Sequence, residues 1–176
     1  MNLTMDEIYF GDYSKLVNAG YSFLFGFGKK DNNDPFSNMR NNMNNSENTA
    51  LDCSSYTALI VDDNVLNIKV AQKTIEKYKF KVDTATSAKS CIEKISNGEK
   101  FDIIFMAYMM PEMDGIETLN NLKKIPGVTL PPVVVLTANA IAGMREKYLN
   151  AGFDEYLSKP INPGELDKVI NTFFGK

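Results

Sequence analysis

From residue 57 onward, short apolar runs alternate with longer segments in which apolar residues recur every three or four positions. The first pattern is typical of buried strands and the second of helices that pack on one side. Strands are expected at about 57–61, 81–86, 102–107, 133–137 and 155–158. Helices are expected at about 65–78, 88–95, 114–122, 141–151 and 162–174.

Strands and helices that alternate at this spacing indicate right-handed β–α–β units around a parallel sheet. Most of the strands are continuously apolar, and this pattern implies that helices cover both faces of the sheet. The sequence therefore predicts an α/β fold of the flavodoxin-like type, with a doubly wound five-stranded parallel sheet and a non-globular N-terminal extension.

The first 53 residues differ from the rest and predict two separate segments. Residues 1–30 are rich in aromatic residues, but glycines interrupt them and the spacing favours neither a helix nor a strand. This segment is too short for its own core and too apolar for a free tail. It is either a remnant of cloning or of an upstream domain, or an arm that docks on the globular part or on a partner. Residues 31–53 are rich in asparagine and are expected to form a flexible linker, which places the globular domain at 54–176.

Composition excludes several classes of function. The 176 residues carry a net charge of -3, which gives no reason to expect binding to nucleic acid. The chain has no histidine, so it lacks the commonest metal ligand and carries no phosphorylatable histidine. Cys53 and Cys91 lie far apart and outside any motif, which favours reduced thiols in a cytoplasmic protein. No apolar run approaches the ~20 residues that a membrane span needs.

Polar residues follow the predicted strands at the edge of the sheet where ligands bind in open α/β folds. Asp62 and Asp63 follow the first strand, and adjacent carboxylates suit Mg²⁺. Thr137 ends the fourth strand and Lys159 follows the fifth; a hydroxyl and an ammonium group together suit a phosphoryl group. Each feature alone is more often a solvated rim residue, but together they predict a phosphoryl site. The central strand, however, ends at Ala107, which carries no functional group.

The loop after Ala107 supports the same interpretation. It contains Pro111, Asp114 and Gly115, which mark the turn from the strand into the next helix. Asp114 is expected to cap that helix by accepting otherwise unpaired backbone N–H groups.

The segments ALIVDDN, FDIIFMAYMMPEMDG, VVVLTANA and EYLSKPI occur in an order and spacing that resemble the receiver domains of two-component signalling. The resemblance covers residues 57–176, and DDNVLN is especially similar to receivers of hybrid histidine kinases and phosphorelays. In that family an aspartate at the end of the third strand accepts a phosphoryl group from a phosphohistidine. The resemblance thus implies a non-enzymatic module, whose parent protein is a stand-alone regulator or a hybrid kinase. It also implies a histidine kinase or a histidine phosphotransfer domain as the partner, and a dimer surface at the fourth helix and fifth strand.

The resemblance also assigns roles to individual residues. It implies a Mg²⁺ site formed by Asp62, Asp63 and the backbone carbonyl of Met109. It implies a phosphoryl-binding switch formed by Thr137, Lys159 and the aromatic residue Tyr156. It also implies a cis peptide bond between Lys159 and Pro160.

The departure from the family is Ala107, which stands where the phosphoacceptor aspartate is expected. Alanine has neither a nucleophile nor a ligand oxygen, so we expect no aspartyl phosphate and weak or absent Mg²⁺ binding. Two interpretations remain: an inactive Asp→Ala variant of an active receiver, which we favour, or a natural pseudo-receiver that signals by binding alone. A flavin-binding flavodoxin is disfavoured, because Asp62 and Asp63 would repel the flavin phosphate.

A receiver switches when a phosphoryl group draws the threonine hydroxyl inward and the aromatic residue follows it. Because Ala107 receives no phosphoryl group, Tyr156 is expected to point outward to solvent and Thr137 to leave the pocket unfilled. An arm formed by residues 8–27 would be the alternative means of holding Tyr156 inward.

Overall fold

The computed structural model describes residues 50–138 and 143–175. The described residues belong to one compact unit, Thr49–Lys176. The predicted arm at 1–30 and most of the predicted linker at 31–53 lie outside the described residues.

The compact unit contains one parallel sheet in the order β2-β1-β3-β4-β5, with β3 at its centre. The strands are β1 Thr57–Val61, β2 Lys81–Ala85, β3 Ile103–Ala107, β4 Val133–Thr137 and β5 Glu155–Ser158. All neighbouring strands pair in parallel. The predicted five-stranded, flavodoxin-like sheet is therefore confirmed.

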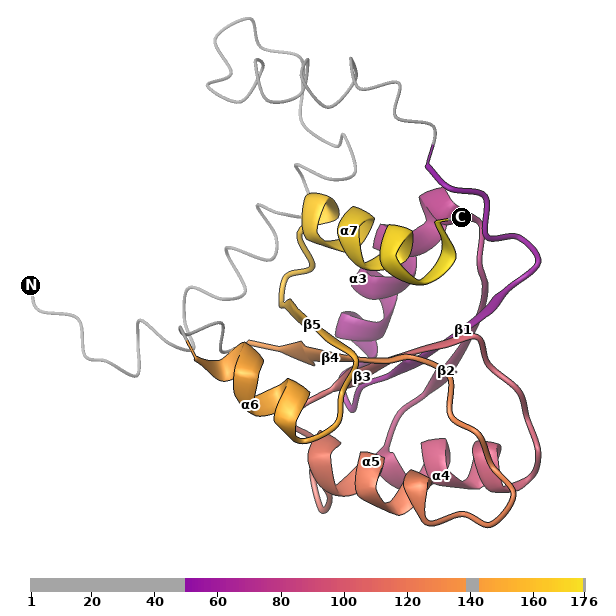
Figure 1. The fold of residues 1–176 in the computed structure, drawn as a ribbon, viewed down its shortest axis with the longest axis vertical. Coiled ribbons are helices and arrows are strands. Elements are labelled where there is room, and N and C mark those ends of the chain that lie inside the picture. The colour runs from indigo at the N-terminus through magenta and orange to yellow at the C-terminus, as the bar shows by residue number, and fades with distance from the viewer. Residues whose placement is uncertain (1–49, 139–142, 176) are drawn as a thin grey trace, which may run out of the picture. The chain divides into compact units, whose positions relative to one another are not determined.

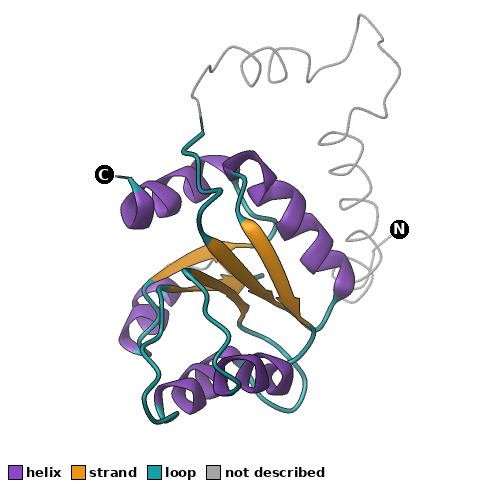
Figure 2. Ribbon diagram, turned by 90° about the vertical axis from the view of Figure 1, so that its right-hand side faces the viewer, coloured by secondary structure: helices purple, strands orange, loops and turns teal. Residues whose placement is uncertain are grey.

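Helices connect successive strands and lie in two layers. They are α3 Val65–Ile75, the 3₁₀ turn η2 Glu76–Tyr78, α4 Ala88–Ser96, α5 Gly115–Lys123, α6 Met144–Asn150 and α7 Pro163–Phe174. Helices α3 and α7 cover one face of the sheet, and α4, α5 and α6 lie on the other (Figure 1). Figure 2 shows the strands enclosed between these layers. None of the helices in the described parts of the chain is long and apolar enough to cross a membrane.

Each face of the sheet has its own hydrophobic core. On the α3–α7 side, Ile68, Ile75 and Ile170 pack against the strands, and on the other side Leu119 and Leu122 do so. The central strands β3 and β4 are buried along their whole length, which explains their unbroken apolar sequences. Both faces of the sheet are thus closed, and the strand ends are left as the place for a site.

Polar caps begin the helices where the sequence places suitable residues. The side chains of Asn64, Ser87 and Asn162 accept backbone N–H groups in the first turns of α3, α4 and α7. The Asp114 side chain caps α5 by accepting the backbone N–H of Glu117, and the Glu117 side chain accepts the backbone N–H of Asp114. Together these bonds form a capping box. The predicted cap at Asp114 is confirmed.

The helix predicted at 65–78 ends earlier than expected, because its last turn tightens into η2. Lys79 follows with a φ of 62°, a left-handed conformation that reverses the chain into β2. A side chain with a Cβ is less stable in this conformation than glycine by roughly 1 kcal/mol. The predicted helix at 141–151 is described only from Met144 onward.

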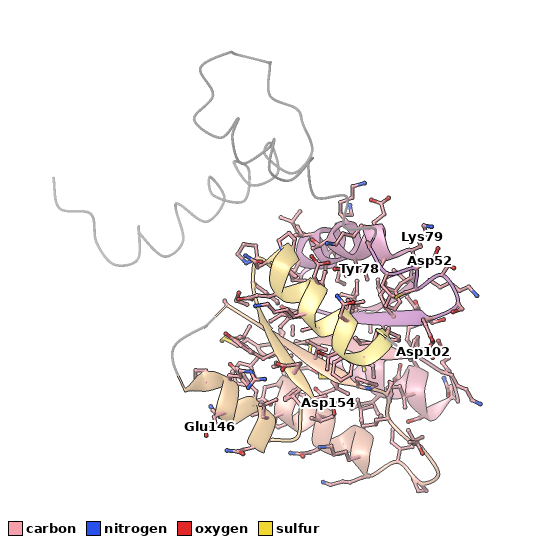
Figure 3. All side chains as sticks on the ribbon, turned by 45° about the horizontal axis from the view of Figure 1, so that its top comes forward. Asp52, Tyr78, Lys79, Asp102, Glu146 and Asp154 are labelled. Carbon is pink, nitrogen blue, oxygen red and sulfur yellow. The ribbon has the colours of Figure 1, made fainter. Side chains whose placement is uncertain are left out.

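Residues just before the predicted boundary at residue 54 also contact the folded unit. Cys53 is fully buried, and its backbone N–H donates to the carbonyl of Tyr78 at 2.8 Å. Asp52 forms an ion pair with Lys79 at 2.7 Å. Figure 3 shows Asp52, Tyr78 and Lys79 at the same end of the domain. The sequence did not reveal this, because these contacts join residues that are more than 20 positions apart.

Both cysteines are free and buried, as the prediction of reduced thiols requires. Burial raises the pKa of Cys91 to about 12, against a smaller lowering effect of Lys94. Burial, with a contribution from Asp52, also raises the pKa of Cys53. Neither thiol is therefore a reactive thiolate near neutral pH.

Candidate functional site

The carboxyl ends of β1, β3 and β4 meet at one edge of the sheet. Val61 pairs with Met106, and Ala107 pairs with Leu136. The residues that follow these pairs, Asp62 and Thr137, are both buried. This edge is the predicted site. At the opposite edge, the carboxylates of Asp102 and Asp154 accept the N–H groups that begin β1 and β4, so those acids have a structural role (Figure 3).

Ala107 is the last residue of β3 and is fully buried. The loop that follows it returns closely to the strand, because the N–H of Gly115 donates to the carbonyl of Tyr108 at 2.7 Å. A Cβ on Gly115 would lie 2.8 Å from the carbonyl oxygen of Ala107, which is too close for a real atom pair. Glycine at position 115 therefore allows the start of α5 to pack directly against the tip of the central strand.

The loop between Ala107 and α5 is held by its own turns. The N–H of Met113 donates to the carbonyl of Pro111 at 2.7 Å, and Glu112 between them has a φ of 67°. Asp114 then begins α5. The residues predicted for this loop thus form the turn that leads from β3 into α5.

Asp62 has several bonding partners at the site, and only 1% of its side chain is exposed. Its Oδ2 forms an ion pair with Nζ of Lys159. Its Oδ1 accepts the backbone N–H of Asn64 at 2.9 Å and the side-chain amide of Asn67 at 3.0 Å. Both carboxylate oxygens therefore have donors, as a buried charge requires. Asp62 and Lys159 were both predicted for the site, but the bond between them was not, and Asn67 was not among the predicted residues.

The fit of this edge to Mg²⁺ is poor. Asp63 is exposed and Asp62 already binds the Lys159 ammonium group. The Met109 side chain is 77% exposed, and its backbone carbonyl is the third ligand that the resemblance implied. Among residues 50–138 and 143–175, no group of three histidine, cysteine, aspartate or glutamate residues could hold a metal ion. The described residues thus offer Mg²⁺ one carboxylate that has no ion pair with Lys159, that of Asp63, and the Met109 carbonyl.

Thr137 ends β4 with its side chain buried and its hydroxyl 3.1 Å from the hydroxyl of Tyr148 on α6. Its carbonyl accepts the backbone N–H of Lys159 at 2.7 Å. The peptide bond between Lys159 and Pro160 is cis, as the resemblance implied. These contacts place the end of β5 beside the end of β4 and bring Lys159 over Asp62.

Tyr156 on β5 lies beside Tyr148 on α6. Its ring is half-buried and stacks on the ring of Tyr148, with the ring centroids 6.3 Å apart and the planes at 23°. Tyr156 is therefore partly shielded from solvent, because the buried Tyr148 on α6 offers its ring a packing partner. Tyr148 was not among the predicted site residues. Its only signal was an aromatic residue within a predicted helix.

Comparison with known proteins agrees with this geometry. The family described as the response regulator receiver domain matches residues 58–171. The chain belongs to this family. The chain is 38% identical over 117 residues to the aerobic respiration control sensor protein ArcB of Escherichia coli. This match covers 66% of this chain but only 15% of ArcB. The chain therefore spans only a small part of the curated relatives that it matches.

Solved structures of other receivers share the fold. An aspartate-to-alanine mutant of the receiver domain of the histidine kinase CKI1 from Arabidopsis thaliana has a TM-score of 0.60 and 29% identity, and covers 69% of this chain and 91% of that one. The CKI1 receiver has also been solved in complex with Mg²⁺ and BeF₃⁻, with a TM-score of 0.56 and 28% identity over the same shares. The Saccharomyces cerevisiae receiver of Ssk1, solved with the histidine phosphotransfer protein Ypd1, has a TM-score of 0.57 and 28% identity, and covers 67% of this chain and 88% of that one.

Proposed function

We propose that the chain is the phosphoacceptor receiver of a phosphorelay in a form that cannot be phosphorylated, with Ala107 in place of the acceptor aspartate. The observation that carries the proposal is the position of Ala107 at the buried tip of the central strand, at the edge where Asp62 and Thr137 also lie. Lys159 reaches the same edge through its ion pair with Asp62.

The chemistry of transfer explains why Ala107 is decisive. In transfer from a phosphohistidine, the N–P bond breaks as a carboxylate oxygen forms the new O–P bond. Thr137 would donate a hydrogen bond to the phosphoryl group and Lys159 would supply a positive charge. The Ala107 methyl group has no oxygen, so the remaining residues have no phosphoryl group to bind.

Mg²⁺ supplies charge neutralisation in this chemistry, and in this form we expect it to bind weakly or not at all. Asp62, Asp63 and the Met109 carbonyl are the residues that would hold it. The ion pair between Lys159 and Asp62 supports weak binding, because a metal ion would have to displace the ammonium group.

The phosphoryl donor must be another molecule or domain, because this chain has no histidine. We propose a histidine kinase or a histidine phosphotransfer domain in the cytoplasm, with a hybrid kinase as one parent protein of the receiver. Among the described residues, the large apolar side chains exposed to solvent are Val65, Leu66 and Met109. They lie at the start of α3 and in the loop after β3, close to the site, where a partner would cover them. The face formed by α6 and β5 is the candidate for dimerisation.

A natural pseudo-receiver remains the second candidate. The observation that favours it is the complete set of partners around Asp62, because the Ala107 site is electrostatically satisfied without a metal ion. Such a module would act by binding alone.

The substitution Ala107→Asp distinguishes the two functions. With Mg²⁺ and acetyl phosphate or phosphoramidate, we expect intact-mass spectrometry to show one added phosphoryl group. The matched control is Ala107→Asn, because asparagine is nearly the same size as aspartate but is not a phosphoacceptor. This variant and the unaltered chain should both stay unmodified. If Ala107→Asp also stays unmodified while a known receiver is labelled, the phosphoacceptor proposal fails.

A further inference from the structure

Tyr148 is a buried tyrosine whose hydroxyl meets a residue of the site. Its side chain is fully buried on α6, and its hydroxyl lies 3.1 Å from that of Thr137. Three aromatic rings lie next to the Tyr148 ring. The centroid distances and interplanar angles are 5.1 Å and 62° for Tyr108, 6.3 Å and 23° for Tyr156, and 6.4 Å and 89° for Phe153. Tyr148 therefore touches Thr137 at the end of β4, Tyr108 at the end of β3 and Tyr156 on β5.

The direction of the bond between the two hydroxyls follows from acidity. Either oxygen can donate in this geometry, but a phenol is a stronger acid than an aliphatic alcohol, so Tyr148 donates and Thr137 accepts. Moving Thr137 away would leave the buried Tyr148 donor without this acceptor. Because an unsatisfied buried donor is unfavourable, the bond holds Thr137 in its present place.

The rings give Tyr148 a second effect. Tyr156 stacks on Tyr148 and is half-buried, so the Tyr148 ring occupies the space on the inner side of Tyr156. A movement of Tyr156 toward Thr137 requires the Tyr148 ring to shift as well. Tyr148 thus restrains both residues to which the resemblance assigns a switching role.

We propose that Tyr148 is a positioning residue that holds Thr137 and Tyr156 in the resting arrangement and so opposes binding of a phosphoryl group. The effect on phosphoryl binding rests on the proposed function, whereas the restraint on Thr137 and Tyr156 rests on the described contacts. A phosphoryl group that draws the Thr137 hydroxyl toward the site must break the bond to Tyr148. Tyr148 therefore sets how easily the receiver leaves its resting state.

The substitution Tyr148→Phe keeps the ring and removes the hydroxyl. Tyr78→Phe is the matched control: Tyr78 is 1% exposed, and its hydroxyl bonds to Asp167 in the core on the other face of the sheet. Both variants should lose stability. In the otherwise unaltered chain, only Tyr148→Phe should shift or broaden the NMR signals of the Tyr156 ring and the Lys159 amide, which donates to Thr137.

The second measurement uses Mg²⁺ and BeF₃⁻ as a phosphoryl mimic in the Ala107→Asp background. Tyr148→Phe should tighten BeF₃⁻ binding about fivefold, as expected for the net loss of one neutral hydrogen bond, whereas Tyr78→Phe should not change it. The inference is overturned if Tyr148→Phe behaves like Tyr78→Phe in the NMR spectra, or if it weakens BeF₃⁻ binding. If no Ala107→Asp protein binds BeF₃⁻, the proposed function fails, and the NMR comparison still decides the role of Tyr148.

Discussion

At the scale of single residues, the site depends on which charges are close to one another. Asp62 is buried and its charge is balanced by Lys159. Ala107 is buried at the tip of the neighbouring strand and adds no charge. A single methyl group at this position thus leaves one buried anion and one cation, whereas an aspartate would add a second anion to the same pocket.

This balance predicts the stability of the aspartate form. In chelator, Ala107→Asp should lower the free energy of unfolding by about 2 kcal/mol, because like charges in a buried pocket repel and the new carboxylate must be desolvated. Urea unfolding at pH 7 measures the difference. Ala107→Asn separates charge from size and should lose less stability, and added Mg²⁺ should restore part of the loss only in Ala107→Asp. An equal or higher stability of Ala107→Asp in chelator would contradict this account.

At the scale of elements, a cluster of polar groups joins η2 to α7. The hydroxyl of Tyr78 and the ammonium group of Lys77 both bond to Oδ1 of Asp167. Burial raises the pKa of Asp167, but the bonds from Lys77 and Tyr78 outweigh it and leave that pKa below its usual value. Burial and then the bond to Asp167 raise the pKa of Tyr78. The cluster therefore stabilises the fold with Asp167 ionised and Tyr78 neutral.

Asp167→Asn should therefore reduce stability at pH 7 by about 1 kcal/mol, a modest value because 39% of the Asp167 side chain is exposed. A carboxyl group with a lowered folded pKa stabilises the fold above its unfolded pKa of about 3.9, and this contribution is lost as the pH falls through the folded value. The difference between Asp167→Asn and the unaltered chain should thus be constant from pH 5 to 8 and shrink below pH 4. Thermal melts across this range provide the measurement. Glu146→Gln, at an exposed position of α6, is the control and should show little difference at any pH. A difference that grows toward low pH would refute the assignment.

At the scale of the whole domain, the entry segment before β1 closes one end of the α3–α7 core. Cys53 is buried there, and the Tyr56 ring packs on Phe174 of α7 with centroids 4.7 Å apart. The Phe174 ring also packs against the Phe80 ring, with the ring centroids 5.3 Å apart. The entry segment and the end of the last helix are thus parts of one core, although they are far apart in sequence.

A chain that starts at residue 54 should therefore be less stable than one that starts at residue 50, by about 2 kcal/mol. The shorter chain loses the buried side chain of Cys53 and its bond to the Tyr78 carbonyl. Urea unfolding of both chains tests this. Asp52→Asn in the longer chain is the control and should cost less than 1 kcal/mol, because its ion pair with Lys79 is exposed. Equal stabilities of the two chains would place the domain boundary at residue 54 after all.

Local sequence was sufficient to predict most of the fold. The unbroken apolar runs of β3 and β4 indicate burial on both faces, and Asn64, Asp114 and Asn162 begin helices because their side chains bond to N–H groups only two or three residues away. These are short-range effects that depend on neighbours in the chain. The alternation of strands and helices then leaves few topologies, which is why a doubly wound parallel sheet could be predicted.

Contacts between distant residues were decided only by the tertiary structure. Lys159 bonds to Asp62 across 97 positions, and Tyr78 bonds to Asp167 across 89. Tyr148 meets Thr137 because α6 folds back over β4, and nothing in the sequence near Tyr148 marks its hydroxyl as a partner of the site. Apolar spacing shows which face of an element is buried, but not which side chain of another element will lie against it. The sequence therefore determined the sheet and the residues that end its strands, and packing determined which side chains of other elements pair with them.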